Sequence, residues 1–293
     1  MKYRHAFHAG NFADVHKHVA LLALLRAMQR KDKGLFFLDT HAGRGRYALG
    51  SGEARTSGEA QHGALAVLAA QRTARNAGPT AAVAPELADY AGVVEAWRRR
   101  ADARHDYPGS AVLAAELLRP QDRGIAVETQ PAEFEALRRT LGRVARVTAE
   151  HGDGWLRLRA LLPPAERRGL LLIDPPYEDT KGDFRAGAGA VHEALARFAT
   201  GVIALWYPVK DARDTDLWLA ALARGLHRPA LAAELWIHPP DSRAGLNGSG
   251  LVVVNPPYQW VERCAAWQPA LLRALGAESS GGTRVASLAG ENR

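Results

Sequence analysis

GLLLIDPPY, residues 169–177, places a short apolar run directly before an aspartate, two prolines and a tyrosine. Similar runs occur at 35–40, 124–129, 146–154, 201–208, 232–240 and 250–258. Short apolar runs bounded by turn residues are typical of buried strands, and stretches with helical periodicity separate most of them here. Alternation of strands and helices predicts an α/β fold, in which a mainly parallel sheet is covered on both faces.

The length of the chain, 293 residues, suits one main domain with an appendage, because domains run to roughly 100–200 residues. Residues 51–105 are Ala-rich and helical in pattern, without a convincing strand. We expect them to form a small helical subdomain inserted after the first strand, so that the main domain comprises 1–50 and 106–277. Polar and turn-forming residues at 278–293 predict a flexible tail.

Both ends of the main domain carry further local signals. Apolar residues at three- and four-residue steps predict a first helix over 13–30, with Asn11 as its N-cap. The last two apolar runs, 232–240 and 250–258, are joined by a loop without a helix. This connection predicts a hairpin that adds one antiparallel strand to the sheet.

The composition limits the classes of protein to consider. Lys and Arg number 38 against 31 Asp and Glu, and the net charge of +7 favours an anionic partner such as nucleic acid. Because 32 of the 38 cations are Arg, a bias that GC-rich coding also produces, charge alone does not identify the partner. The single cysteine, Cys264, excludes a disulfide framework. The N-terminus lacks the apolar segment of a secretory signal, and the run 19–25 is too short to span a membrane. We therefore expect a soluble, cytoplasmic protein.

The tetrapeptide from Asp174 to Tyr177 is the strongest chemical signal. Ligands of parallel sheets bind outside the carboxyl ends of the strands, which is where this turn falls. A flat heterocycle with an exocyclic amine fits it: Tyr177 would stack on the ring, while Asp174 and the carbonyl of Pro175 would accept the amine hydrogens. The pattern is that of S-adenosylmethionine-dependent amino-methyltransferases. A bare tetrapeptide could equally be a sharp strand exit, but the apolar strand before it and the glycine loop after an earlier strand favour chemistry.

A second copy of the motif, Asn255 to Tyr258, follows the last apolar run. Asparagine in the first position also occurs in methyltransferases that act on protein glutamine, so the choice between the copies affects the substrate. Asp174 follows the fourth strand, in the order expected of a class I methyltransferase fold. We assign the chemistry to Asp174 and interpret Asn255 as a structural turn.

The cofactor half of the site is predicted from LDTHAGRGRY, residues 38–47, and two later acids. Gly43 permits close approach of the backbone to a ligand, but the fuller glycine fingerprint of nicotinamide enzymes is missing. The next acid that closes a strand is Glu128, 85 residues later, a gap that the insertion explains. Glu128 could accept the ribose hydroxyls of S-adenosylmethionine, and Asp153, before Gly154, could face its adenine. Each acid alone could instead cap a helix.

The N-terminal segment YRHAFHAGNFADVHKH, residues 3–18, is rich in histidine. We predict no metal site, because His16 and His18 do not share a helix face and a third ligand is not evident. A solvated, basic helix start is the plain interpretation, and a lid that faces the substrate is the alternative that we favour. Tyr3 would stack on a base, and Lys17, together with Arg4, Arg44 and Arg46, would face phosphate.

Seven ordered blocks extend a resemblance over nearly the whole chain: YRHAFHAGNFADVHKH, LDTHAGRGRY, YPGS, HGDG, LIDPPYE, RFATGVIALWYPV and VVNPPY. In these blocks the sequence resembles the 23S ribosomal RNA adenine-N6 methyltransferases of the J type. The resemblance implies a monomer with the class I (Rossmann-like) methyltransferase fold. It implies S-adenosylmethionine contacts at His18, His41, Ser110, Glu128, Asp153, Gly154 and Asp174. It also implies a substrate face at Tyr3, His5 and Lys17, and 23S rRNA as partner, free or in early assembly.

The expected reaction is direct displacement, in which adenine N6 attacks the sulfonium methyl while Asp174 and Pro175 orient the amine. Unstacking of the adenine favours single-stranded or opened RNA. Two alternatives remain at this point: a DNA adenine-N6 methyltransferase, and a non-catalytic RNA-binding or ribosome-assembly factor on the same fold.

Overall fold

The computed structural model describes residues 8–50, 52, 58–78, 84–100, 102–142, 146–239, 242 and 245–289. Tyr3, Arg4 and His5, which we placed at the substrate face, lie outside these residues. None of the helices in these ranges combines the length and the apolar character that a membrane span requires.

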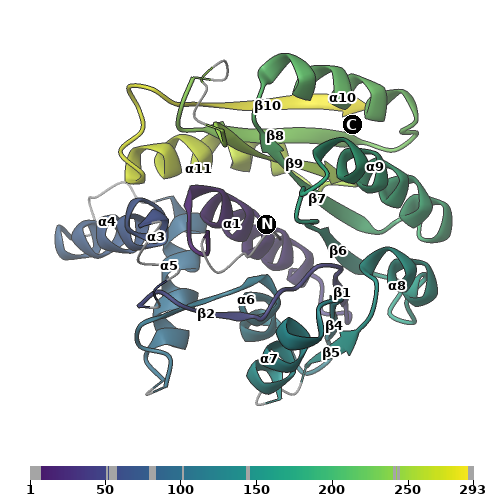
Figure 1. Ribbon diagram of the computed structural model, residues 1–293, viewed down its shortest axis with the longest axis horizontal. Helices are drawn as coiled ribbons and strands as arrows, with labels where there is room; N and C mark the ends of the chain where they lie inside the picture. The colour runs from purple at the N-terminus through teal and green to yellow at the C-terminus, as the bar shows by residue number, and fades with distance from the viewer. Residues whose placement is uncertain are drawn as a thin grey trace.

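Eight strands form one sheet in the order β10-β8-β9-β7-β6-β1-β4-β5 (Figure 1). The strands are β1 (Phe36–Asp39), β4 (Arg123–Glu128), β5 (Val147–His151), β6 (Gly169–Ile173), β7 (Val202–Val209), β8 (Ala230–Trp236), β9 (Gly248–Val254) and β10 (Gly282–Ala289). The five strands from β5 to β7 in this order are parallel, whereas β9 runs antiparallel to both β7 and β8. The predicted hairpin and its antiparallel strand are thereby confirmed.

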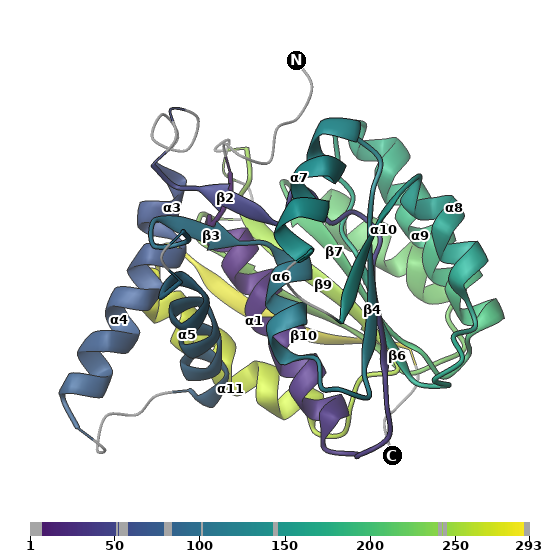
Figure 2. The same cartoon turned by 90° about the horizontal axis from the view of Figure 1, so that it is seen from below.

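Helices cover both faces of the sheet, as Figure 2 shows edge-on. One face packs against α1 (Phe12–Gln29), α6 (Ser110–Leu117), α7 (Pro131–Leu141) and α11 (Trp260–Ala274), and the other against α8 (Gly154–Leu161), α9 (Thr180–Arg197) and α10 (Ala212–Arg224). Side chains of β7 alternate accordingly: Ala204 joins the first core, whereas Ile203 and Leu205 join the second. The strands are therefore buried on both sides, which explains their continuous apolar runs.

The first helix begins where the sequence predicts, because Oδ1 of Asn11 accepts the backbone N–H of Asp14 at 2.9 Å. It is buried on nearly all sides, including Leu21 and Leu24, which are not exposed to solvent at all. The reason is that α1 lies between the sheet and a second layer of helices. A helix covered on both sides needs no polar face, so its amphipathic pattern is weak.

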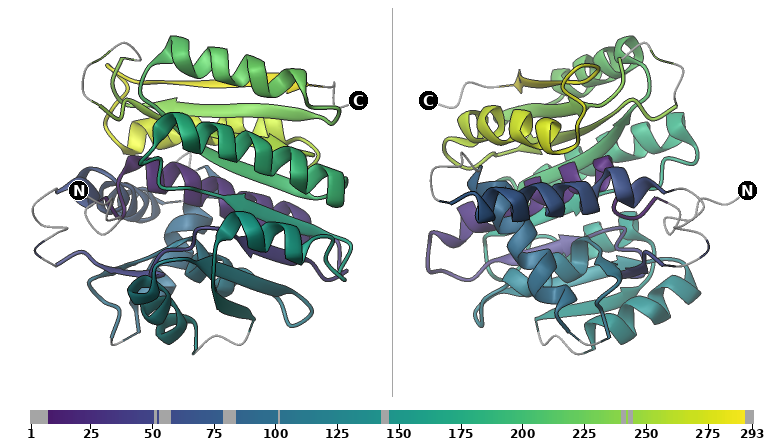
Figure 3. Two further views of the ribbon diagram at one scale, coloured as in Figure 1. Left: turned by 45° about the vertical axis from the view of Figure 1, so that its right-hand side comes forward. Right: turned by 90° about the vertical axis from the view of Figure 1, so that its left-hand side faces the viewer.

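The second layer is formed by α3 (Glu59–His62), α4 (Ala64–Asn76) and α5 (Pro85–Arg98), which lie between two short strands. These strands, β2 (Arg46–Ala48) and β3 (Asp106–Pro108), pair antiparallel and bring the two ends of the helical segment together. Figure 3 shows the segment alongside α1 and α11, which it contacts through α4 and α5. The segment between β1 and β4 thus builds one wall over the first helix.

The expectation of a flexible tail is wrong for residues 282–289, which form β10 and pair antiparallel with β8. Arg284 reaches the buried Glu234 of β8, with Nε 2.5 Å from Oε2. Val285 and Leu288 pack against the cores on opposite faces. Two features hid this strand in the sequence. Polar residues come just before it, and the small side chains of a half-exposed edge strand give a weak apolar signal.

Candidate active site

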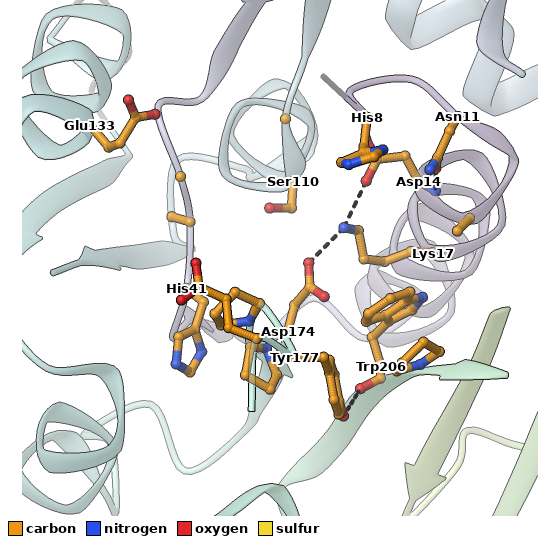
Figure 4. Close-up of a pocket in the computed structure, with 18 of the residues that line it drawn as sticks. His8, Asn11, Asp14, Lys17, His41, Ser110, Glu133, Asp174, Tyr177 and Trp206 are labelled. Atoms are coloured by element: carbon orange, nitrogen blue, oxygen red, sulfur yellow. Dashed lines mark hydrogen bonds and ion pairs between the residues drawn. The ribbon is translucent and has the colours of Figure 1, made fainter. Parts of the chain in front are cut away.

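A cavity of about 1430 Å³ opens at the carboxyl ends of the parallel strands. Its position is the switch point of the sheet, where β1 lies between β4 and β6 and the order of the strands reverses. Residues from α1, the glycine loop after β1, the turn after β6, strand β7 and the segment that follows β8 line it (Figure 4). Pockets for one small molecule are roughly 300–1,000 Å³, so this cavity has room for two ligands side by side.

The turn after β6 brings Asp174, Pro175 and Tyr177 into the cavity lining. Tyr177 has a left-handed backbone (φ 53°), and its hydroxyl donates to the carbonyl of Trp206 at 2.6 Å. Its ring also packs edge-on against Trp206, with the centroids 5.5 Å apart. The prolines and this hydrogen bond fix the ring relative to Asp174, as the motif predicts.

Lys17 is where the structure departs most from the sequence analysis. Its Nζ lies 2.6 Å from Oδ2 of Asp174 and 2.8 Å from Oδ1 of Asp14, and its side chain is only 5% exposed (Figure 4). Burial favours the neutral amine, but the two carboxylates outweigh it and raise the pKa of Lys17. The ammonium therefore binds the motif carboxylate, and the expected contact with phosphate is not supported.

The residues beside Lys17 are also buried, so a solvated helix start is excluded. His16, Lys17 and His18 project in three directions from one turn of α1, because successive helical residues are about 100° apart. Nδ1 of His18 lies 2.7 Å from the hydroxyl of Tyr107, at the base of the inserted helices. Two of the other expected cations are paired as well, Arg44 with Glu133 and Arg46 with Asp102 and Asp106, whereas Arg4 lies outside the described residues.

The glycine loop and Glu128 form one unit on the cofactor side. Oε2 of Glu128 accepts the backbone N–H of Gly43 at 3.0 Å, and Oε1 accepts that of Gln130 at 2.6 Å. Burial raises the pKa of Glu128. Gly43 has φ +59°, and a Cβ there would lie 2.3 Å from the Tyr47 hydroxyl. The left-handed backbone and the close hydroxyl both favour glycine at this position, and Gly43 lines the cavity.

Asp153 caps a helix and also lies at the cavity, where we expected it to face the cofactor. Its Oδ1 caps α8, accepting the N–H groups of Trp155 at 2.8 Å and Leu156 at 3.1 Å, and it also lines the cavity. Beside it, a Cβ at Gly154 would lie 2.0 Å from the carbonyl oxygen of Thr40. The ring of His41 packs against Trp155, with centroids 4.6 Å apart, and burial lowers its pKa to about 4. His41 is therefore neutral, and it forms a flat wall beside the loop.

Asp39, the last residue of β1, is a site residue that the sequence patterns did not single out. Its carboxylate is fully buried, with Oδ2 accepting the Ser110 hydroxyl at 2.5 Å and Oδ1 accepting the N–H of His41 at 3.2 Å. Burial raises the pKa of Asp39 to about 7. An acid at the end of the strand that precedes the glycine loop was the available signal. Trp206 of β7 was also missed, although its ring lines the cavity beside Lys17.

The second copy of the motif is far from this chemistry. Because β9 runs antiparallel to β7, Asn255 lies at the amino ends of the parallel strands, opposite the cavity. Its Nδ2 donates there to the carbonyls of Ala199 at 3.0 Å and Gly201 at 2.8 Å. Its backbone is left-handed, with φ 52°. The prediction of a structural turn is confirmed.

The sheet order, the glycine loop held by an acid and the Asp-Pro-Pro-Tyr turn together define a class I S-adenosylmethionine-dependent methyltransferase. The family model for ribosomal RNA large subunit methyltransferase D, RlmJ, matches residues 32–288. The chain belongs to this family.

Individual relatives agree with the family match. Two proteins named ribosomal RNA large subunit methyltransferase J, from Haemophilus influenzae and Escherichia coli, are 37% and 39% identical to this chain. The matches cover 97% and 88% of this chain, and 98% and 88% of the relatives. A crystal structure of a Legionella pneumophila protein has a TM-score of 0.82 at 33% identity, over 96% of this chain and 98% of that chain.

Proposed function

We propose that this protein transfers a methyl group from S-adenosylmethionine to the N6 amine of an adenine in 23S ribosomal RNA. The observation that carries the proposal is the carboxylate of Asp174. Lys17 holds its Oδ2, whereas Oδ1 accepts no hydrogen bond from the described part of the chain. An acceptor is thus held in place at the cavity. The relatives named as large-subunit ribosomal RNA methyltransferases support the class of substrate.

S-adenosylmethionine supplies a methyl group on a positively charged sulfur. The attacking amine is a poor nucleophile, because its lone pair is delocalised into the adenine ring. Hydrogen bonds from N6 to Oδ1 of Asp174 and to the carbonyl of Pro175 would localise the pair and aim it, with Tyr177 against the ring. N6 forms its bond to the methyl carbon as the bond from that carbon to sulfur breaks, and the proton that N6 then loses goes to Asp174 or to solvent. The protein residues act by orientation, and Lys17 contributes by fixing the carboxylate.

The cofactor half of the cavity supports the remaining assignments. We assign the ribose hydroxyls to Glu128, whose carboxylate already holds the loop at Gly43, and the adenine to Asp153 and Gly154. His18, His41 and Ser110 complete the compartment, although the observed partners of His18 and Ser110 are Tyr107 and Asp39. Tyr3 and His5 stay assigned to the substrate face.

The adenine must leave its stack to reach Asp174, which favours single-stranded or opened RNA. We therefore propose that the substrate is 23S rRNA that is free or in early assembly. We also propose that the enzyme is monomeric and cytoplasmic.

The proposal is tested with labelled S-adenosylmethionine and protein-free 23S rRNA. Asp174→Ala is expected to abolish methyl transfer while circular dichroism shows a folded protein; Tm should fall, because the buried Lys17 loses one of its two carboxylates. Asn255→Ala in the second motif is the matched control and should keep its activity. Full activity of Asp174→Ala would refute the role of the carboxylate. Methylation of DNA but not of RNA by the wild type would favour the DNA methyltransferase alternative.

A further inference from the structure

Trp206 forms the part of the cavity wall that contacts both Lys17 and Tyr177 in the proposed substrate compartment. Nζ of Lys17 lies 5.7 Å from the centroid of its ring, and the ring of Tyr177 packs edge-on against it. Its carbonyl accepts the Tyr177 hydroxyl. A small rotation of this indole would therefore change the space that a base can occupy beside Asp174.

The indole is held from behind by a serine on the neighbouring strand. Nε1 of Trp206 donates to Oγ of Ser249 at 2.9 Å, and Nδ1 of His16 lies 2.9 Å from the same oxygen. Ser249 and His16 are fully buried, on β9 and α1 respectively. Neither residue lines the cavity, so both act on it only through Trp206.

The hydrogen-bonding partners of His16 fix the direction of each hydrogen bond. Nε2 of the buried Gln268 lies 2.9 Å from Nε2 of His16 and 3.3 Å from the carbonyl oxygen of Glu234. A flipped amide would place two acceptors together at Glu234, so the amide nitrogen donates to both. Nε2 of His16 is therefore an acceptor.

Burial lowers the pKa of His16 to about 3, so the ring is neutral at working pH and its single hydrogen is on Nδ1. Ser249 Oγ accepts from both His16 and Trp206, which uses both of its lone pairs.

We propose that His16 and Ser249 are positioning residues that hold the indole of Trp206 in the orientation that admits the target base. The proposal rests on the proposed function, since it names the support of that same compartment. His16 supplies the Nδ1–H that anchors Ser249, and Ser249 supplies the oxygen that fixes Trp206. Because the His16 ring does not line the cavity, it takes no part in proton transfer.

A double-mutant cycle separates positioning from simple packing. Ser249→Ala should lower kcat/KM for 23S rRNA about tenfold, which is the effect of about one hydrogen bond. In the Trp206→Phe background, which keeps an aromatic wall but lacks the N–H, the same change should cost less than about twofold. Ser287→Ala, on the exposed edge strand, is the matched control and should not change kcat/KM. Calorimetric affinity for S-adenosylmethionine should be the same in all variants.

Effects of Ser249→Ala and Trp206→Phe that simply multiply would overturn the proposal, because packing alone would then account for Ser249. A second readout, the fluorescence emission of Trp206, needs no RNA. It is obtained as the difference between proteins with and without Trp206→Phe, measured with Ser249 and again with Ser249→Ala. The difference spectrum should shift in Ser249→Ala, and an unshifted spectrum contradicts the proposal. If the wild type methylates no RNA, the proposed function fails, and the emission difference still tests the positioning.

Discussion

The substitution Asp39→Asn should stabilise the protein, by an amount that grows with pH. Asp39 is not exposed to solvent, and burial raises its pKa from an ordinary 3.8 to about 7. Below pH 3.8 the folded and unfolded states both carry the proton. Between pH 3.8 and about 7 the folded state retains a proton that the unfolded state releases, so stability falls as pH rises. Above pH 7 the loss is complete.

The magnitude follows from the rise of the Asp39 pKa from 3.8 to about 7. Each unit corresponds to about 1.4 kcal/mol, so the free energy of unfolding falls by about 4 kcal/mol in total and by about 3 kcal/mol between pH 5 and pH 8. Asparagine does not titrate, and its amide can still contact Ser110 and His41. For a chain of 293 residues, about 0.6 kcal/mol corresponds to one degree in Tm. The advantage of the variant over the wild type should therefore widen by roughly 5 °C.

The measurement is Tm of wild type and variant at pH 5 and pH 8. Asp122→Asn is the control with the opposite sign: burial raises the pKa of Asp122, but hydrogen bonds from Arg119 outweigh it and lower the pKa. That variant should be less stable than the wild type at both pH values. A difference in Tm between Asp39→Asn and the wild type that is equal at pH 5 and pH 8 would show that the pKa of Asp39 is not raised in the folded protein.

Two further substitutions test the edge strand and the cofactor loop. Arg284→Met leaves the 3% exposed Glu234 without its cation. Because Arg284 itself is 39% exposed, we expect the free energy of unfolding to fall by about 2 kcal/mol, which is roughly 3 °C in Tm by calorimetry. Arg273→Met, in an exposed pair, should leave Tm unchanged. Glu128→Gln removes a charged acceptor and should weaken the binding of S-adenosylmethionine about tenfold, as measured by titration calorimetry. An unchanged affinity would exclude the assignment of the ribose hydroxyls to Glu128.

Much of the fold could be predicted because its signals are local. The apolar run before Asp174, the glycines of the first loop and the cap at Asn11 each depend on a few neighbouring residues. The edge strand β10 could not be predicted in this way. Its side chains are small and half-exposed, and its stability depends on pairing with β8, some 50 residues earlier.

The same distinction applies to the site. The motif identifies Asp174, but its partner Lys17 is 157 residues away, and only the packing of α1 over the sheet brings them together. Charge patterning suggested phosphate for Lys17, because a sequence does not show that two carboxylates surround the ammonium. Asp39 and Trp206 were missed for a related reason: burial and long-range hydrogen bonds give them their importance.

Methyl transfer to adenine N6 is measured directly by mass spectrometry of nucleosides from 23S rRNA after reaction with the purified protein and methyl-deuterated S-adenosylmethionine. The wild type should give one deuterated product, N6-methyladenosine, and Asp174→Ala should give none. A label found on another base or on ribose, or an equal yield of product from Asp174→Ala, would contradict this prediction.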